Sequence, residues 1–453
     1  MTNGIITTSE PRATVLIGRF RAEFGRAPTA LVRAPGRVNL LGEHTDYNGL
    51  PVLPMAIDRN VLIAAAPSDD RIVRLRNVDA AFRAREYEIT ADIPPYPDSD
   101  WGNYHKAAVQ GLRHYSHGNL RHGGHFLVDG NIPAGAGLSS SSALVVASAL
   151  TTLAVNEIDV PFADLAERLP HAERYVGTLS GGMDQAISLL AIAGQALRID
   201  FFPLRTRAVP LVPGYQFVVC HSLVKAEKSG RAKQAYNRRV VECRLGTRVC
   251  EVALAGALPR ALSTLGDLVG LFPGRALPEF LPAIEARLPP RPLSLAELAG
   301  IIGMSPTQLR EACGASADLG DEFAVLSRLR HVFTEAARVD RAEHVLATGD
   351  ATGFGMLMDA SHASCRDDYE ISCPEVEALV AAAKECGALG ARVTGAGFGG
   401  CIVALVESDA VAGFLDLIDR RFYRARLGSN HGAAAHRFVF RACAGAQVEH
   451  FAG

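Results

Sequence analysis

The sequence predicts an α+β fold in two lobes. Candidate strands and helices are interspersed through both halves of the chain, which favours mixed layers over a helical bundle. At 453 residues the chain is long enough to build more than one hydrophobic core. The segment 203–213 carries three prolines and little periodicity. We therefore expect an N-terminal lobe over 1–212 and a C-terminal lobe over 213–453.

The first half begins with strands. Short apolar or alternating runs between Gly, Pro and Asp breaks predict strands at 30–33, 61–66, 72–76 and 125–128. Apolar residues at helical spacing then predict two helices, at 143–157 and 162–175. These elements suffice for a sheet covered by helices.

The second half mixes helices with fewer strands. A strand at 216–220 is followed by a long helix at 233–254, and an irregular Pro-rich insertion is expected over about 257–318. Beyond the insertion, periodicity predicts helices at 327–347, 374–386 and 410–426 and strands at 402–406 and 436–441.

Composition excludes several function classes. The chain has 46 Lys and Arg against 48 Asp and Glu, so no global charge attracts nucleic acid or an anionic membrane. Its nine cysteines never form a Cys-x-x-Cys pair, which suits a reducing compartment. The polar first ten residues do not resemble a signal peptide, and the apolar stretch 143–155 is too short to span a bilayer. We expect a cytoplasmic protein.

The segment 36–48 concentrates functional side chains. Arg37, Glu43, His44 and Asp46 lie within ten positions of one another. Such a set of donors and acceptors is typical of a site for a small polyhydroxylated molecule. A solvated turn of mixed charge is the structural alternative, and the spacing fits no standard structural zinc site.

A second motif, 131–143, is rich in Gly and Ser. It lies between a predicted strand and a predicted helix, so its backbone N–H groups would gather at a helix N-terminus and favour phosphate. A Ser-rich helix cap is the simpler alternative, although one cap needs one Ser rather than four in a row. The chain has no Gly-Lys-[Ser/Thr], which excludes a Walker A loop.

The third and fourth motifs, 177–185 and 394–401, are also rich in glycine. In 177–185, Asp184 follows three glycines, and Glu173 lies on the preceding predicted helix; an ordinary helix cap is the alternative for this Asp. In 394–401, Gly395, Gly397 and Gly400 match the dinucleotide fingerprint but lead into a strand rather than a helix. A dehydrogenase is therefore excluded, and so is a protein kinase, because His-Arg-Asp and Asp-Phe-Gly are missing.

Taken together and in this order, the four motifs resemble the GHMP small-molecule kinase superfamily and, within it, the galactokinase family. The segments 101–104, 236–243 and 361–370 support the resemblance, which covers essentially the whole chain. It implies a two-lobed GHMP kinase fold, with a mixed sheet and helices in the N-lobe. The C-lobe would hold a ferredoxin-like antiparallel sheet with helices.

The resemblance also implies an activity: transfer of phosphate from ATP, with Mg²⁺, to the C1 hydroxyl of galactose. It implies that this hydroxyl faces Asp184, with Arg37 beside it. The sugar would be bound by Glu43, His44, Asp46, Gly181 and Tyr236. ATP would be bound by Gly135, Ala136, Gly137, Leu138, Ser139, Ser140 and Trp101, and Mg²⁺ by Ser141 and Glu173.

Two alternatives remain open at this point. The insertion around 293–312 and the segments 242–245 and 364–367 resemble a longer, eukaryotic-type branch of the family, which includes N-acetylgalactosamine kinase. A non-catalytic galactose- and ATP-binding regulator is the second alternative. All of these interpretations require Arg37 and Asp184, remote in sequence, to meet opposite the Ser-rich loop.

Overall fold

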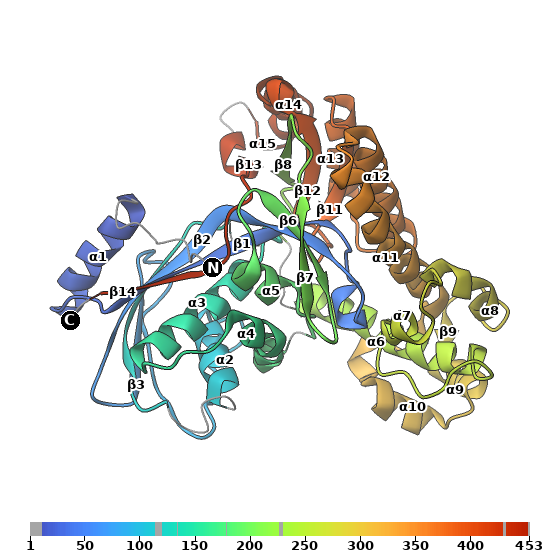
Figure 1. Ribbon diagram of the computed structural model, residues 1–453, viewed down its shortest axis with the longest axis horizontal. Helices are drawn as coiled ribbons and strands as arrows, with labels where there is room; N and C mark the ends of the chain where they lie inside the picture. The colour runs from blue at the N-terminus through green and yellow to red at the C-terminus, as the bar shows by residue number, and fades with distance from the viewer. Residues whose placement is uncertain are drawn as a thin grey trace.

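The fold is described by a computed structural model that covers 11–113, 120–133, 135–177, 179–225, 230–428 and 432–451. The first ten residues, for which we expected no signal peptide, lie outside this range, as do Ala134 and Thr178 within the predicted motifs. Both halves of the described chain combine helices with sheets, so the predicted α+β class is confirmed (Figure 1).

The first half is built on a six-stranded mixed sheet. β3 runs parallel to β5, and every other neighbouring pair in this sheet is antiparallel. In sheet order the strands are β14 (Gln447–His450), β1 (Ala30–Leu41), β2 (Leu53–Pro67), β5 (Gly124–Gly130), β3 (Ile72–Asn77) and β4 (Arg85–Glu88).

Both faces of this sheet are buried, as alternate residues of β2 show. Val61, Ile63 and Ala65 belong to the main core, whereas Leu62 and Ala64 pack with residues of α1 in a smaller one. α1 therefore covers one face, and helices that follow β5 cover the other (Figure 1). The helices of the first half are α1 (Pro11–Phe24), α2 (Gly102–Arg113), α3 (Ser140–Val155), α4 (Phe162–Arg168) and α5 (Met183–Leu190).

Two predictions in the first half need correction. The helix expected over 162–175 ends as α4 at Arg168, and a 3-10 segment continues it over Leu169–Val176, because Pro170 has no N–H to donate to an α-helical bond. No strand was predicted in the Pro-rich segment 203–213. The segment contains β7 (Arg205–Pro210), which pairs with β6 (Gln195–Asp200).

The second half is built on a four-stranded antiparallel sheet, as expected. Its strands in sheet order are β11 (Gly390–Thr394), β12 (Cys401–Glu407), β8 (Tyr215–His221) and β13 (Arg437–Val439). Val403 and Leu405 face the core shared with the first half, whereas Ile402 and Ala404 face the helices. The helices that surround this sheet are α6 (Gly230–Ala253), α11 (Val325–Ala347), α12 (Ala351–Asp367), α13 (Pro374–Glu385), α14 (Val411–Ile418) and α15 (Arg424–Leu427).

The insertion expected over about 257–318 forms a group of short helices beside α6 (Figure 1). Ser294 and Ser305 each cap a helix with a reciprocal bond to the residue three positions later. The short elements are α7 (Asp267–Leu271), α8 (Leu281–Glu285), α9 (Leu295–Ile302), α10 (Pro306–Cys313), and a two-stranded pairing of β9 (Leu293–Ser294) with β10 (Glu322–Phe323).

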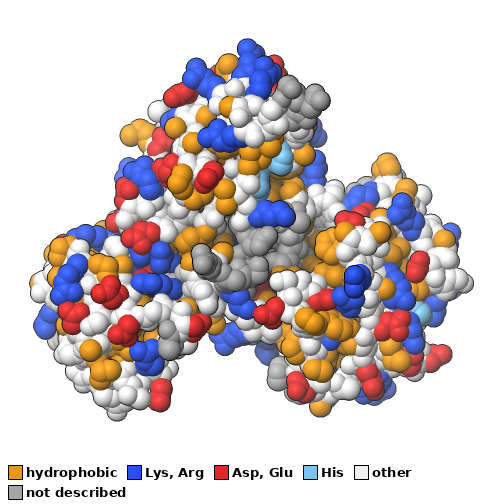
Figure 2. Space-filling model, turned by 180° about the vertical axis from the view of Figure 1, so that it is seen from behind, with side chains coloured by type: hydrophobic (Ala, Val, Ile, Leu, Met, Phe, Trp, Pro, Cys, Tyr) orange, Lys and Arg blue, Asp and Glu red, His pale blue; other side chains and the backbone are white. Residues whose placement is uncertain are grey.

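The chain end returns to the first sheet, where β14 pairs with β1. The division into lobes at residue 212 stays a prediction. Viewed from behind, basic and acidic side chains are interspersed over the surface, in keeping with the balanced composition (Figure 2). Within the described part of the chain, no helix has the length and apolarity needed to cross a bilayer.

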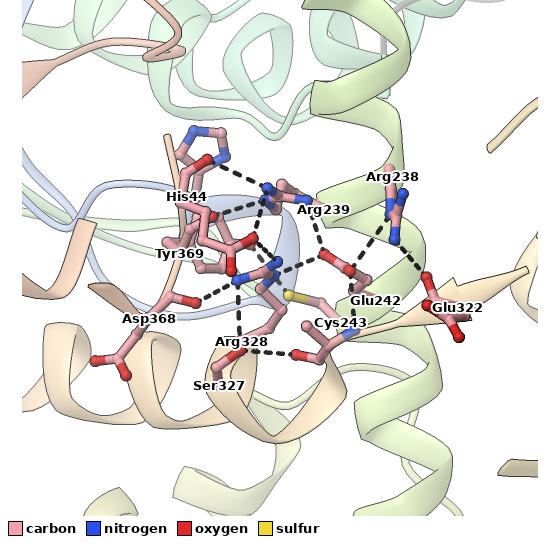
Figure 3. Close-up of polar contacts among 12 residues, drawn as sticks. His44, Arg238, Arg239, Glu242, Cys243, Glu322, Ser327, Arg328, Asp368 and Tyr369 are labelled. Carbon is pink, nitrogen blue, oxygen red and sulfur yellow. Dashed lines mark hydrogen bonds and ion pairs between the residues drawn. The ribbon is translucent and has the colours of Figure 1, made fainter. Parts of the chain in front are cut away.

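A buried ionic network joins α6 to α11 (Figure 3). Arg328 donates to Glu242 at 2.7 Å and to Glu370 at 2.6 Å, and it also contacts the carbonyl of Asp368. Arg239 donates to the same Glu242 carboxylate at 3.1 Å. Arg328 is 1% exposed and Glu242 is fully buried, so each charge depends on the others for compensation.

We predict that Arg328→Met lowers the free energy of unfolding by about 3 kcal/mol, because it removes the shortest ion pair of the buried Glu242 carboxylate and leaves only the longer contacts of Arg239 at 3.1 Å and Arg238 at 3.6 Å. Urea denaturation of both proteins measures the difference. Arg330→Met, two residues further on the same helix, is the matched control. Its ion pair with Glu285 is more than a third exposed, and its loss is expected to cost less than about 1 kcal/mol. Equal losses in the two variants would contradict the prediction.

Candidate active site

Arg37 and Asp184 meet, as the sequence analysis required. The Nε of Arg37, on β1, donates to Oδ1 of Asp184 at 2.7 Å, across 147 positions of the chain. Asp184 lies in the first turn of α5. The side chains are 6% and 12% exposed, so the pair is partly desolvated but still reachable by a small molecule.

The Ser-rich loop lies against this pair. Arg37 donates from Nη1 to the carbonyl of Gly137 at 2.6 Å, and the hydroxyl of Ser139 donates to Oδ2 of Asp184. Ser139 is the N-cap of α3 in a left-handed conformation (φ 59°), and its side chain does not cap the helix. The first amides of α3 therefore keep their capacity to bind an anion, beside the ion pair. Ala136 and Leu138 of the same loop are buried.

Glu173 contacts Ser142, a serine that the predicted site did not include. The Oγ of Ser142, rather than that of Ser141, donates to Glu173 and also lies 3.3 Å from Oδ2 of Asp184. Ser180 donates to the other Glu173 oxygen at 2.5 Å. Helical geometry explains the difference: Ser141 and Ser142 point about 100° apart around α3, and only Ser142 is fully buried on the Glu173 side.

Two carboxylates of the site differ in their cationic contacts: Asp184 pairs with Arg37 at 2.7 Å. Glu173 is 2% exposed and forms no ion pair with the residues that the structure describes. The described residues also contain no group of three or more His, Cys, Asp and Glu suited to hold a metal alone. A cation here would need ligands from a bound molecule as well as from Glu173 and the serine hydroxyls.

Asp46 and Gly181 are in direct contact. A Cβ added to Gly181 would lie 2.2 Å from Cγ of Asp46, so only glycine fits there. The backbone N–H of Met183 donates to Asp46 at 3.3 Å. Burial, and then the negative charge of Asp184, raise the pKa of Asp46 to about 6. Asp46 is thus close to protonation and suited to accept or donate a hydrogen bond.

His44 ends a directional hydrogen-bond chain. Burial and the nearby His331 lower its pKa to about 3, so the ring is neutral. Its Nε2 lies 3.1 Å from the carbonyl oxygen of Ala396, which only accepts, so the ring proton is assigned to Nε2. Nδ1 then accepts from the hydroxyl of Tyr47 at 3.0 Å, and Tyr47 accepts from Tyr369.

Figure 3 shows His44 and Tyr369 beside the Arg239–Glu242–Arg328 network. The thiol of Cys243 lies 3.2 Å from the Tyr369 hydroxyl, and Arg239 donates to the Tyr369 carbonyl at 2.7 Å. The position of His44 is thereby tied to helices of the second half. Both of its ring nitrogens are occupied by the protein, so its predicted contact with a sugar hydroxyl stays a prediction.

Glu43 forms a buried pair with a residue that sequence reasoning missed. Arg392, fully buried on β11, donates to Oε2 of Glu43 at 2.7 Å, and the N–H of Gly395 reaches the same oxygen at 3.2 Å. Burial raises the pKa of Glu43 despite this pairing. Arg392 is a charged residue inside the apolar run before the Gly-rich turn, and this unusual position is the sequence signal that could have identified it.

The Gly-rich turn 394–401 joins β11 to β12 in a hairpin, as the strand-like residues after it predicted. It packs on the phosphate-loop candidate: a Cβ on Gly395 would lie 2.5 Å from the carbonyl oxygen of Gly137. The structure thus brings all four motifs together at one site: 36–48, 131–143, 177–185 and 394–401.

Two predicted residues remain. The ring of Tyr236, on α6, lies 5.1 Å from that of His44, and burial together with Asp46 and Asp184 raises its pKa well above the ordinary value. Tyr236 therefore faces the carboxylates as a neutral donor. Trp101 is buried at the start of α2, and its indole N–H donates to the carbonyl of Arg83 at 2.8 Å. Its role near adenine stays a prediction.

Comparisons with known proteins agree with this geometry. A galactokinase galactose-binding signature matches residues 18–67, and the N-terminal and C-terminal domains of GHMP kinases match 103–191 and 342–422. A galactokinase of Dictyostelium discoideum is 35% identical, with 94% of this chain and 91% of the relative covered. The chain belongs to the galactokinase family.

Other members of the galactokinase family lead to the same assignment. A galactokinase of Roseiflexus sp. (strain RS-1) is 37% identical, with 94% of this chain and 95% of the relative covered. These two relatives match almost equally, so placement in the eukaryotic-type branch stays a prediction.

Solved structures bear out the GHMP kinase fold. The structure of Lactococcus lactis galactokinase complexed with galactose has a TM-score of 0.75 at 27% identity and covers 96% of this chain and 99% of its own. Methanococcus jannaschii mevalonate kinase shares the fold at a TM-score of 0.57 and 14% identity, over 91% of this chain and 98% of its own.

We predict that Asp184→Asn lowers the pKa of Asp46 from about 6, because the variant removes a neighbouring negative charge. A carbon-13 NMR titration of the carboxyl signals measures the shift, with Asp46→Asn used for assignment. Arg37→Met is the control of opposite sign: it removes a positive charge that lowers this pKa, so the pKa rises.

The same pKa fixes a pH dependence of stability. The folded state holds the Asp46 proton more tightly than the unfolded state, so this residue costs stability increasingly from about pH 4 to pH 6. The loss of unfolding free energy between about pH 4 and pH 6 is therefore expected to be smaller in Asp184→Asn. A pKa of Asp46 that is equal in all three proteins would contradict the proposed coupling.

Proposed function

We propose that this chain transfers the γ-phosphoryl group of ATP to the C1 hydroxyl of galactose, giving galactose 1-phosphate. The observation that carries the proposal is the ion pair of Arg37 and Asp184, held against the amide-rich start of α3. The galactokinase relatives and the galactose complex of the Lactococcus lactis enzyme supply the substrate. ATP follows from the kinase family.

Phosphoryl transfer passes through a loose transition state, so the protein contributes mainly positioning and charge neutralisation. Negative charge on the oxygens of the transferred phosphoryl group is stabilised by the positive charge of Arg37 and by the N-terminal amides of α3. We assign the ATP phosphates to Gly135, Gly137 and Ser140 together with their loop neighbours. This loop presents backbone at the N-terminus of a 16-residue helix.

Asp184 is proposed to orient the C1 hydroxyl. A carboxylate is a weak base toward a ground-state hydroxyl, so we assign proton acceptance to a late stage, when bonding to phosphorus has made the hydroxyl acidic. Ser139 and Arg37 hold the two oxygens of Asp184, one each. This fixes the carboxylate in one rotamer and aims it at the space beside the loop.

The sugar is proposed to lie between the first motif and α6. Asp46, the backbone at Gly181 and the Tyr236 hydroxyl offer donors and acceptors for its other hydroxyls. The hydrogen bonds that described residues donate to the Glu43 carboxylate both end on Oε2, so Oε1 is able to accept from a sugar hydroxyl. His44 is proposed to border the sugar with its ring.

Mg²⁺ fits the donor set on this chain. Glu173 is a buried carboxylate whose oxygens are met by serine hydroxyls rather than by a cation. Mg²⁺ prefers such oxygen ligands and completes its octahedron with phosphates and water. We propose that Glu173, with Ser141 or Ser142, would hold it, and that the ion would neutralise charge on the ATP phosphates.

We predict that the purified chain releases ADP with galactose and that Asp184→Asn lowers kcat by about 10²–10⁴-fold while galactose still binds. A coupled ADP-release assay measures kcat, and calorimetry measures galactose binding. Asp409→Asn, at an exposed carboxylate, is the matched control and keeps wild-type kcat. A kcat of Asp184→Asn within a few-fold of wild type would refute the assignment.

A substrate panel separates the remaining alternatives in the same assay. It contains galactose, N-acetylgalactosamine, glucose, mevalonate and homoserine. A higher kcat/KM for N-acetylgalactosamine than for galactose would replace the sugar in the proposal. Galactose binding without ADP release from the wild-type chain would favour the non-catalytic regulator.

We predict that Glu173→Gln raises the Mg²⁺ concentration for half-maximal rate by at least about tenfold, because a neutral amide binds a divalent cation less strongly. Rates measured across an Mg²⁺ series at fixed ATP test this. Glu311→Gln, at an exposed position on α10, is the control. An unchanged Mg²⁺ requirement in Glu173→Gln would show that this carboxylate is not a ligand.

A further inference from the structure

A cavity lies beside the turn that precedes α5. Its volume is about 470 Å³, within the range of small-molecule sites. The described residues that line it include Asp46 and 179–182, but not Arg37, Asp184 or Tyr236. The cavity therefore shares Asp46 and Gly181 with the proposed sugar site and extends from them to residues of α4 and of the segment between β6 and β7.

Basic side chains predominate around this cavity. Arg168, His171, Arg174 and Arg244 contribute to its lining, against the carboxylates of Asp46 and Glu167. Asp46 accepts a hydrogen bond from the backbone N–H of Met183 at 3.3 Å. Glu167 accepts a hydrogen bond from the backbone N–H of Leu204 at 3.3 Å.

Two of these arginines, Arg174 and Arg244, line the cavity from different segments of the chain. Arg174 forms no ion pair with any residue that the structure describes. The described contact of Arg244 is with the carbonyl of Cys313, at 3.3 Å. Burial, and then repulsion by the positive charge of Arg174, lower the pKa of Arg244. An anion between them would relieve that repulsion.

The rest of the lining is apolar and aromatic. Phe201 packs against the turn, because a Cβ on Gly182 would lie 3.0 Å from its ring. Phe202 is 73% exposed, the largest exposure among the large hydrophobic side chains described, and stands at the rim. Pro170 and Leu204 complete a surface on which a planar ring stacks favourably.

We propose that this cavity binds a small organic anion that carries an aromatic ring. The anionic group would lie between Arg174 and Arg244, and the ring would lie against Phe201 and Pro170. Because the bound molecule touches the backbone at 181–182, two residues before Asp184, it also changes the affinity for galactose. This second statement rests on the proposed function, whereas the first does not.

The probe for the test is 8-anilinonaphthalene-1-sulfonate, an aromatic sulfonate whose fluorescence rises in an apolar site. We expect saturable binding at one site on the full chain. Arg174→Gln/Arg244→Gln should weaken it at least tenfold, since the stems remain and only the charges are lost. Arg19→Gln/Arg420→Gln, at two exposed positions outside the cavity, should keep affinity within twofold. Absence of saturable binding, or equal loss in the control, overturns the site.

Probe titrations in the presence of galactose show whether the probe binds beside the sugar site or in the sugar site itself. For two coupled sites, galactose shifts the apparent Kd of the probe to a plateau, and the probe shifts the KM for galactose by the same factor when KM reports binding. For one shared site, the apparent Kd of the probe rises in proportion to galactose without limit, which overturns the proposal. A KM that the probe leaves unchanged overturns the link to the sugar. Loss of kinase activity alone does not affect the fluorescence reading.

Discussion

Arg37 on β1 and Asp184 on α5 form an ion pair that is mostly removed from water, and three of the four motifs reach the site through these two residues. Such a pair gains little stability by itself, because desolvation offsets the Coulomb attraction. Its value is geometric. Further hydrogen bonds, from Arg37 to the carbonyl of Gly137 and from Ser139 to Asp184, tie both groups to the Ser-rich loop, so the carboxylate, the guanidinium and the helix amides keep fixed relative positions.

Close backbone contacts make this arrangement possible. The turn 394–401 touches the Ser-rich loop at Gly395 and Gly137, and the turn before α5 touches the first motif at Gly181 and Asp46. A Cβ at Gly395 would lie 2.5 Å from the carbonyl oxygen of Gly137, and one at Gly181 would lie 2.2 Å from Cγ of Asp46, so a side chain at either position would push the segments apart. The glycines of the motifs therefore serve mainly to bring other backbone and side-chain groups together.

The second half of the chain supports the site from behind. The hydrogen bonds from Cys243 through Tyr369 and Tyr47 to His44 connect α6 to the first motif, and the Glu242–Arg328 pair fixes the position of α11 against α6. Arg392 on β11 pairs with Glu43 at full burial. The side chains of the first motif thus depend on residues of α6, α11 and β11 that the four motifs do not include.

The sequence alone determined the α+β class, the positions of most strands and helices, the motifs and the family, because periodicity and Gly-rich spacing are local properties. It placed Arg37 and Asp184 together only through the resemblance. Tertiary structure decided that Ser142 rather than Ser141 meets Glu173, that Arg392 pairs with Glu43, and that 203–213 contains a strand. Each of these depends on which face of an element is buried against a distant segment, and no local pattern encodes that choice.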